Sequence, residues 1–291
     1  MMKDPLFSLI VPAYNLGTYL DAAVRSILAQ SFRDFELILV DDGSQDDTAD
    51  RCRHYAAAEP ERVRFLSCSH AGVSSARNRG LEAAAGRYVL FVDGDDRLCP
   101  GILDALSREL LREQPDMLYF DFFKGEAEAP VPCSDREPVY LEECEEQTAL
   151  KKLREQTIPC FACCFRKEFL DRKEIRFDLR QFYVEDALFF FQALHAAGRV
   201  GYYPQVGYHY LIRPGSATHL SDCGIRIFAN EYRGWRKIGR YLPRSRAIRR
   251  LYRGWVRMTR RSLEYKFAAD ALSRVFPRRG RAAKEKEADK I

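Results

Sequence analysis

Short apolar runs alternate along the first 123 residues with stretches in which apolar residues recur every three or four positions. The stretches favour helices, and the first, over 19–31, carries Leu20, Val24 and Ile27 on one face. The short runs are typical of buried strands, and they cover Phe7–Pro12, Glu36–Val40, Val63–Cys68, Tyr88–Val92 and Met117–Phe122. Strands that alternate with helices predict βαβ units, a mostly parallel sheet and an α/β fold.

Hydroxyl residues and glycines mark the predicted helix ends. The segment Ser44–Asp47 has the pattern of a capping box and predicts the start of a second helix. Ser74 and Ser75 predict the cap of a third helix, which Gly86 ends. A fourth helix is expected over 101–113.

The alternation breaks in the second half of the chain. Prolines and acids dominate 125–146, which predicts a surface excursion that leads into a helix near 141–154. After it, the pattern predicts a short helix over 167–172, an apolar helix over 187–197, and two separate strands over 200–203 and 207–212.

Three carboxylates follow the strand over 88–92, at Asp93, Asp95 and Asp96. Open α/β sheets place their ligand crevice at the carboxyl ends of the strands. Hard oxygen ligands crowded together suit Mg²⁺ or Mn²⁺. The spacing alone leaves two interpretations open, a metal site and a solvated acidic turn.

A second acid pair, Glu185 and Asp186, stands at the start of the apolar helix over 187–197. Carboxylates at this position are stabilised by the free N–H groups and the dipole of the helix, so a capping role is one interpretation. The aromatic residues on both sides, such as Phe182 and Phe189, favour the other, a partly dry pocket that tunes the pKa of a carboxylate.

The composition sets the broad class of protein. An apolar fraction of 46% in 291 residues fits a globular chain, and no apolar run is long enough to span a membrane. The N-terminus has no signal-peptide pattern, so a cytoplasmic location is expected. Nine cysteines without paired spacing fit a reducing compartment. We interpret the group at Cys160, Cys163 and Cys164 as buried thiols rather than a zinc site.

The net charge of +5 hides a strong asymmetry between the two ends of the chain. Residues 223–291 contain 21 Lys/Arg and 6 Asp/Glu, so this end carries about +15 and the rest about −10. Within 245–275, apolar residues such as Tyr252 and Trp255 alternate with arginines at helical spacing. An amphipathic basic helix of this kind predicts peripheral attachment to the anionic inner face of the cell membrane, with Tyr252 and Trp255 at the level of the lipid headgroups. A helix packed on the main domain is the alternative; nucleic acid is not expected as a partner, because no recognition motif accompanies the charge.

Several motifs together resemble the successive signatures of family 2 glycosyltransferases, which have the GT-A fold and use nucleotide-sugar donors with inversion. The resemblance extends over about residues 6–220. The motifs are Leu9–Asn15, Val40–Ser44, Ala71–Asn78, Phe91–Asp96, Arg176–Phe177, Glu185–Phe189, Tyr208–Tyr210 and Arg213–Ser216. Gly94 stands where the family often has Ser, and Phe161–Cys163 replaces a segment that borders the acceptor in the family.

The resemblance implies roles for particular residues. The loop of Pro12, Ala13, Tyr14 and Asn15 would hold the base and ribose, with Tyr14 stacking on uracil. Asp42 would accept a hydrogen bond from the base. The remaining donor contacts would come from Arg77, Asn78, Asp93 and Gly94.

The resemblance also implies the catalytic groups. Asp95 would bind Mn²⁺ or Mg²⁺, with Asp93 as a second ligand. Asp186 would act as the general base and Glu185 would help to bind the acceptor. A lid that touches the diphosphate would include Arg213, Ser216 and His219; a polar surface loop is the alternative interpretation of these three.

The expectation for the whole chain is a metal-dependent inverting glycosyltransferase that acts on a glycan or lipid-linked acceptor in surface polysaccharide biosynthesis. Residues 1–222 would form the GT-A domain, with a nucleotide-sugar half at 1–123 and an acceptor half at 124–222. A basic helical extension would follow at 223–277, and a disordered charged tail at 278–291. The alternative is a non-catalytic nucleotide-sugar-binding relative. This chain lacks the glycine-rich loops that a sugar nucleotidyltransferase and a dinucleotide-binding dehydrogenase need, so neither function is expected.

Overall fold

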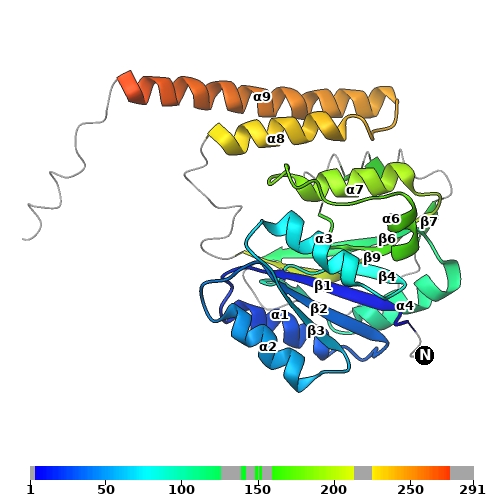
Figure 1. Cartoon of the computed structure of the whole chain (residues 1–291). Coiled ribbons are helices and arrows are strands. Elements are labelled where there is room, and N and C mark those ends of the chain that lie inside the picture. The colour runs from blue at the N-terminus through cyan, green and yellow to red at the C-terminus, as the bar shows by residue number, and fades with distance from the viewer. Residues whose placement is uncertain are drawn as a thin grey trace, which may run out of the picture.

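The structure, a computed structural model, describes residues 4–125, 139–141, 148–149, 151–152, 159–212 and 225–275. One twisted sheet forms the centre, helices cover both of its faces, and two long helices form a further layer outside (Figure 1). The predicted helix over 141–154 lies partly outside the described residues; Val139–Leu141 is strand β7, and helical backbone is described at 148–149 and 151–152. The predicted tail at 278–291 also lies outside them.

The first half of the chain forms the parallel part of the sheet, as its apolar pattern predicts. The strands lie in the order β3–β2–β1–β4, and Leu9 of β1 is paired with Leu37 of β2 and Leu90 of β4. The strands are β1 (Phe7–Ala13), β2 (Phe35–Asp41), β3 (Val63–Ser67) and β4 (Tyr88–Phe91). The helices between them are α1 (Tyr19–Leu28), α2 (Thr48–Ala58) and α3 (Val73–Ala83).

The second half adds strands of mixed direction. Strand β8 (Cys163–Arg166) lies antiparallel between β4 and β6 (Met117–Gly125), and β9 (Val200–Leu211) runs parallel to β6. The short strands β5 (Arg97–Leu98) and β7 pair with β9. Helices α4 (Ile102–Glu113), α6 (Lys167–Arg172) and α7 (Glu185–Ala196) complete the domain.

The two strands predicted over 200–212 are one continuous strand, β9. Tyr203 is paired with Phe120 and Val206 with Asp121, so β9 contains two residues without a counterpart at this point. These residues are Pro204 and Gln205. Proline cannot donate to a sheet ladder, and a bulge lets the strand continue past it.

Both predicted serine caps are wrong, because Ser44 and Ser74 form hydrogen bonds with residues outside the helices that they were expected to cap. Helix α2 begins at Thr48, and the hydroxyl of Ser44 accepts a hydrogen bond from the N–H of Asn15 at 3.0 Å. Helix α3 begins at Val73, directly after Gly72. Gly72 has a φ of 91°, a conformation that glycine adopts at little cost and other residues do not. The hydroxyl of Ser74 donates to the carbonyl of Gln181.

Two apolar cores lie on opposite faces of the sheet. One includes residues of α1 and α4, such as Leu20 and Leu106. The other is rich in aromatic rings: Phe91 of β4 meets Phe189 of α7 edge to face at 5.6 Å. Burial of such rings fixes α7 against the sheet and with it the acid pair at its first turn.

Helices α8 (Ile225–Ile238) and α9 (Arg246–Val275) form the outer layer, with α8 on α7 and α9 on α8 (Figure 1). Trp235 of α8 and Trp255 of α9 stack at 4.9 Å, and Ile248 is fully buried. The apolar side of α9 therefore covers α8, which corrects the expectation that Tyr252 and Trp255 meet lipid headgroups. Within the described residues, we find no helix whose length and apolar character would let it cross a bilayer.

Candidate active site

The loops that follow β1, β2 and β4 meet at one edge of the sheet, because the carboxyl ends of parallel strands point the same way. The first two loops are tied directly: the N–H of Gln45 donates to the side chain of Asn15 at 2.8 Å, and the N–H of Asp42 donates to the carbonyl of Ala13. The turn after β4 packs against them. A Cβ on Gly94 would lie 2.4 Å from Leu16 and 3.0 Å from the carbonyl oxygen of Pro12.

Asp42 holds the loop that leads into α3. Its buried carboxylate accepts hydrogen bonds from the N–H groups of Ala71 at 2.9 Å and Gly72 at 2.8 Å. The Nδ1 atom of His70 lies 2.9 Å from the same carboxylate. The contact of Asp42 with a base stays a prediction, and any such contact would add to these bonds.

Tyr14 and His70 form a stacked pair at the surface beside Asp42. Their ring centroids are 4.2 Å apart, and Tyr14 is 40% exposed. Stacked, partly exposed rings offer a flat face on which another aromatic ring can lie. His70 is not among the predicted site residues; its only mark in the sequence is its place directly before the Ala71–Asn78 motif.

Arg77 joins the two acid groups that the sequence separates. Its side chain is 3% exposed, with Nη2 2.8 Å from Asp93 and Nη1 2.5 Å from Asp186 and 3.2 Å from Glu185. The ring of Phe177 lies 5.2 Å from the centre of the guanidinium. A single buried cation thus holds the turn after β4 to the first turn of α7.

The electrostatics of this cluster are strongly perturbed. Burial raises the pKa of Asp186 to about 8; Arg77 works against this shift, and the charges of Glu185 and Asp93 add to it. Burial of the Arg77 guanidinium works to lower its pKa. The carboxylates around it outweigh this effect and hold that pKa well above its ordinary value. A carboxyl group with a pKa near neutrality is suited to accept and return a proton.

The start of α7 is supported by α8. Val184, just before the acid pair, has a φ of 57°, a conformation that costs a β-branched residue energy. A Cβ on Gly234 of α8 would lie 2.4 Å from the side chain of Val184, so a glycine is needed for this close packing. Asn230 accepts hydrogen bonds from the N–H groups of Phe182 and Tyr183.

Asp96 and Tyr208 fix the turn after β4 to β9. The hydroxyl of Tyr208 accepts a hydrogen bond from the N–H of Asp93 at 3.0 Å and donates to Asp96 at 2.7 Å. Asp96 also accepts from the N–H of Leu211 at 2.8 Å. Burial, with the nearby charges of Asp93 and Asp95, raises the pKa of Asp96 to about 8. The third acid of the run is therefore a positioning group.

Asp93 and Asp95 remain as half-buried carboxylates on this turn. Among the described residues, we find no group of three or more His, Cys, Asp or Glu side chains able to hold a metal ion alone. Mg²⁺ is usually bound by one or two carboxylates together with substrate phosphates. The two aspartates fit an ion that is shared with a phosphate ligand.

The cysteines behave as predicted buried thiols in the part of the chain that is described. Cys160, Cys163 and Cys164 are all buried and have no disulfide partner. Cys160 donates a weak hydrogen bond from its thiol to Asp186 at 3.5 Å.

Asn78 lies next to the site without facing it. Its side-chain amide donates to the carbonyl of Phe177 and accepts from the N–H of the same residue, both at 2.9 Å. Asn78 thereby holds the ring that lies against Arg77, and its contact with a ribose or diphosphate stays a prediction. The predicted lid residues Arg213, Ser216 and His219 lie outside the described residues.

Comparisons with known proteins agree with this geometry. The model of the family described as glycosyl transferase family 2 matches residues 8–172. The protein named uncharacterized glycosyltransferase EpsJ, from Bacillus subtilis, is 32% identical over 220 residues, which cover 74% of this chain and 64% of EpsJ. The chain therefore spans less than two thirds of the length of this relative.

Solved structures show the same fold. Residues 1–349 of S. aureus TarS in complex with UDP-GlcNAc match with a TM-score of 0.65 at 23% identity, covering 79% of this chain and 66% of that one. The mannosyltransferase PcManGT of Pyrobaculum calidifontis, in complex with GDP-Man and Mn²⁺, matches with a TM-score of 0.63 at 16% identity, covering 94% and 76%. The mixed sheet described above is thus the GT-A fold of glycosyltransferases.

Proposed function

Because the chain belongs to glycosyl transferase family 2, we propose that it moves a sugar from a nucleotide-sugar donor to a hydroxyl group of a glycan or lipid-linked acceptor. We propose inversion at the anomeric carbon, a UDP-sugar as the donor, a hexose or N-acetylhexosamine as the sugar, and surface polysaccharide biosynthesis as the setting. The convergence of Asp93 and Asp186 on Arg77 is the observation that carries this proposal.

The donor would lie along the edge of the sheet. The stacked rings of Tyr14 and His70 support a place for the base, and Asp42 lies directly beside them. Asp93, which accepts a hydrogen bond from Arg77 at 2.8 Å, would be near the ribose. TarS in complex with UDP-GlcNAc and PcManGT in complex with GDP-Man support a nucleotide-sugar donor, and they differ in the nucleotide.

The aspartates after β4 would hold a divalent ion, Mn²⁺ or Mg²⁺, with Asp95 as the main ligand and Asp93 as the second. A bound ion of this kind supplies Lewis-acid neutralisation of the charge that develops on a departing diphosphate. The complex of PcManGT with Mn²⁺ supports this choice.

Asp186 would act as the general base. An acceptor hydroxyl is a poor nucleophile until a positioned base takes its proton, which typically contributes about 10²–10⁴-fold. The side chain of Asp186 is 25% exposed, which supports access of an acceptor to it although Arg77 holds one carboxylate oxygen. Glu185, on the same first turn, would bind the acceptor.

A panel of nucleotide sugars, with and without Mn²⁺, tests this function. Measurable release of free nucleotide from one donor, stimulated by Mn²⁺ and abolished by chelation, is the expected result. Thermal stabilisation by the same donor without any turnover would instead support the non-catalytic nucleotide-sugar-binding alternative. Neither stabilisation nor turnover with any donor would contradict the proposal.

A further inference from the structure

The outward side of α9 is a ridge of arginines, and we call Arg246, Arg249, Arg250, Arg253 and Arg257 the arginine ridge. All five side chains are exposed. At 1.5 Å per residue the ridge extends for about 16 Å along the helix. The segment 246–263 contains seven arginines and no acid.

The ridge is not neutralised within the described residues. No ion pair among them joins a carboxylate to any of its five arginines, whereas Arg260, just beyond it, pairs with Glu264. Arg246, Arg249, Arg250, Arg253 and Arg257 line a shallow hollow of about 620 Å³. Like charges gathered without counterions repel one another, and an anionic partner removes that repulsion.

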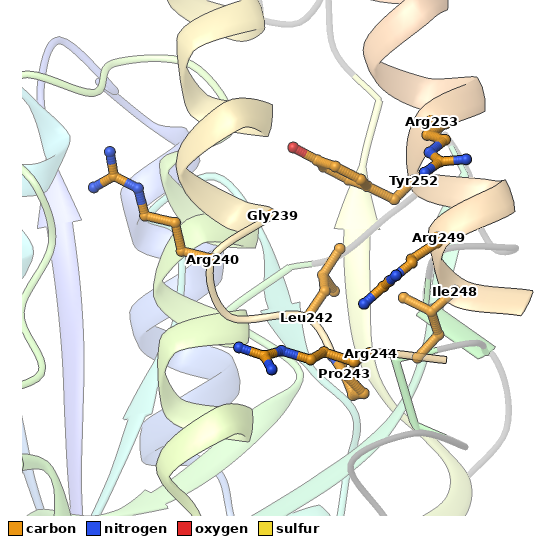
Figure 2. Close-up of a pocket in the computed structure, with 9 residues that line it drawn as sticks. All are labelled: Gly239, Arg240, Leu242, Pro243, Arg244, Ile248, Arg249, Tyr252 and Arg253. Carbon is orange, nitrogen blue, oxygen red and sulfur yellow. The ribbon is translucent and has the colours of Figure 1, made fainter. Parts of the chain in front are cut away.

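A second hollow, of about 580 Å³, lies at the turn between α8 and α9 (Figure 2). Arg240 and Arg244 of the turn line it together with Arg249 and Arg253 of the ridge. Its apolar lining is Leu242, Pro243 and Ile248. Guanidinium groups around a shallow depression suit phosphate oxygens, with which they form paired hydrogen bonds.

The other side of α9 packs against α8 and the turn that follows α8. Trp255 stacks on Trp235, and the hydroxyl end of Tyr252 lies against Gly239, directly after α8. These aromatic groups are therefore not free to enter a bilayer, nor to stack with the bases of a single-stranded nucleic acid. The ridge offers charge alone.

The geometry points to an anionic lipid surface as the partner of the arginine ridge, contacted through headgroup phosphates without insertion of the helix. The ridge belongs to the outermost helix layer, so a flat surface can reach it without meeting the rest of the protein (Figure 1). Residues 1–222 carry about −10 and residues 223–291 about +15, so an anionic surface attracts the α9 side and repels the body. The inference needs no property of the active site.

Vesicle flotation of the full chain tests this inference. Phosphatidylcholine vesicles are compared with vesicles in which phosphatidylglycerol replaces about one third of the lipid. The protein is expected to float with the anionic vesicles only, and to be released at about 0.5 M NaCl by screening. Each basic residue near such a surface contributes about fivefold to binding, so replacing four of them should weaken it about 600-fold if their contributions are independent. The four substitutions are Arg246→Gln, Arg249→Gln, Arg250→Gln and Arg253→Gln.

A charge-matched control separates the ridge from net charge. It replaces four exposed arginines outside α8 and α9, Arg33→Gln, Arg87→Gln, Arg108→Gln and Arg172→Gln, and should float like the wild type. Equal loss of binding in both variants would overturn the inference, as would equal flotation of the wild type with neutral vesicles. Binding to duplex DNA without binding to anionic vesicles would overturn it too.

The mode of docking has its own readout, because the only two tryptophans of the chain are Trp235 and Trp255. Their emission reports on the α8–α9 contact alone. On anionic vesicles the emission should be unchanged, and lipids brominated in the acyl chains should not quench it. Quenching by those lipids would show that α9 inserts and would contradict docking by the arginine ridge.

Discussion

The guanidinium of Arg77 lies 2.5 Å from a carboxylate oxygen of Asp186, although the two residues are 109 positions apart. Arg77 comes from α3, in the half that carries the parallel strands, and Asp186 from the first turn of α7. Through its second nitrogen Arg77 also holds Asp93, so the group proposed as base and the group proposed near the ribose share one cation. This contact is the physical link between the two halves of the proposed site.

Replacing Arg77 should be costly to the fold. In Arg77→Met three carboxylates lose their buried counterion, and we expect the free energy of unfolding to fall by about 3–5 kcal/mol near pH 8. The loss should shrink toward pH 5, because Asp186, whose pKa is about 8, is then protonated and no longer needs a counterion. Urea unfolding at both pH values measures this. In the double variant with Asp186→Asn, the two losses should be less than additive; strict additivity would show that the two groups are not coupled.

The raised pKa of Asp186 predicts the pH dependence of the reaction. A general base acts in its deprotonated form, so kcat/KM should rise with pH through the pKa of Asp186, about 8, rather than through the ordinary range of carboxyl groups. In Glu185→Gln the acid limb should move to lower pH, because the charge of Glu185 raises the pKa of Asp186. An acid limb that Glu185→Gln leaves in place would contradict this electrostatic account.

Tyr208→Phe should loosen the turn that carries Asp93. The change leaves the N–H of Asp93 without its acceptor and removes one of the two donors to Asp96, which costs about 1–3 kcal/mol of stability. We also expect weaker binding of a nucleotide diphosphate, measured by calorimetry. The matched control is Tyr232→Phe, a half-buried tyrosine of α8, and it should change neither quantity. Equal effects in the two variants would remove Tyr208 from the site.

Asp95→Ala should abolish the dependence of donor binding on metal. The wild type should bind a nucleoside diphosphate more tightly with Mn²⁺ than with chelator, and the variant should bind equally weakly under both conditions. Asp46→Ala, an exposed aspartate before α2, is the control and should keep the response to Mn²⁺. A response that survives in Asp95→Ala would place the ion elsewhere.

Much of the fold could be predicted because the parallel strands are buried on both faces and read as unbroken apolar runs, such as Leu37–Val40. The serine caps were wrong because hydroxyl patterns describe an isolated helix, whereas Asp42 binds the loop before α3 through long-range contacts. Strand β9 was divided at Pro204 because a bulge leaves no mark in apolar periodicity.

The sequence predicts the acidic residues of the candidate site, but it does not predict the long-range contacts that join them. Acids at strand and helix ends are visible in a sequence, but the bridge made by Arg77 joins residues 16 and 109 positions away. The same holds for Tyr208, whose hydroxyl reaches Asp93 across 115 positions. The packing of Trp255 on Trp235 depends on where α8 lies, which the amphipathic pattern of α9 alone does not specify.

The most direct test of the proposed function is the turnover of the preferred nucleotide sugar by Asp186→Asn, with donor affinity measured on the same protein. This substitution keeps the shape of the side chain and removes its ability to take a proton. Donor affinity should stay within about twofold of the wild type, and turnover should fall by at least about 10²-fold. Transfer at the wild-type rate would contradict the assignment of Asp186 as the base, and with it the proposed reaction at this site.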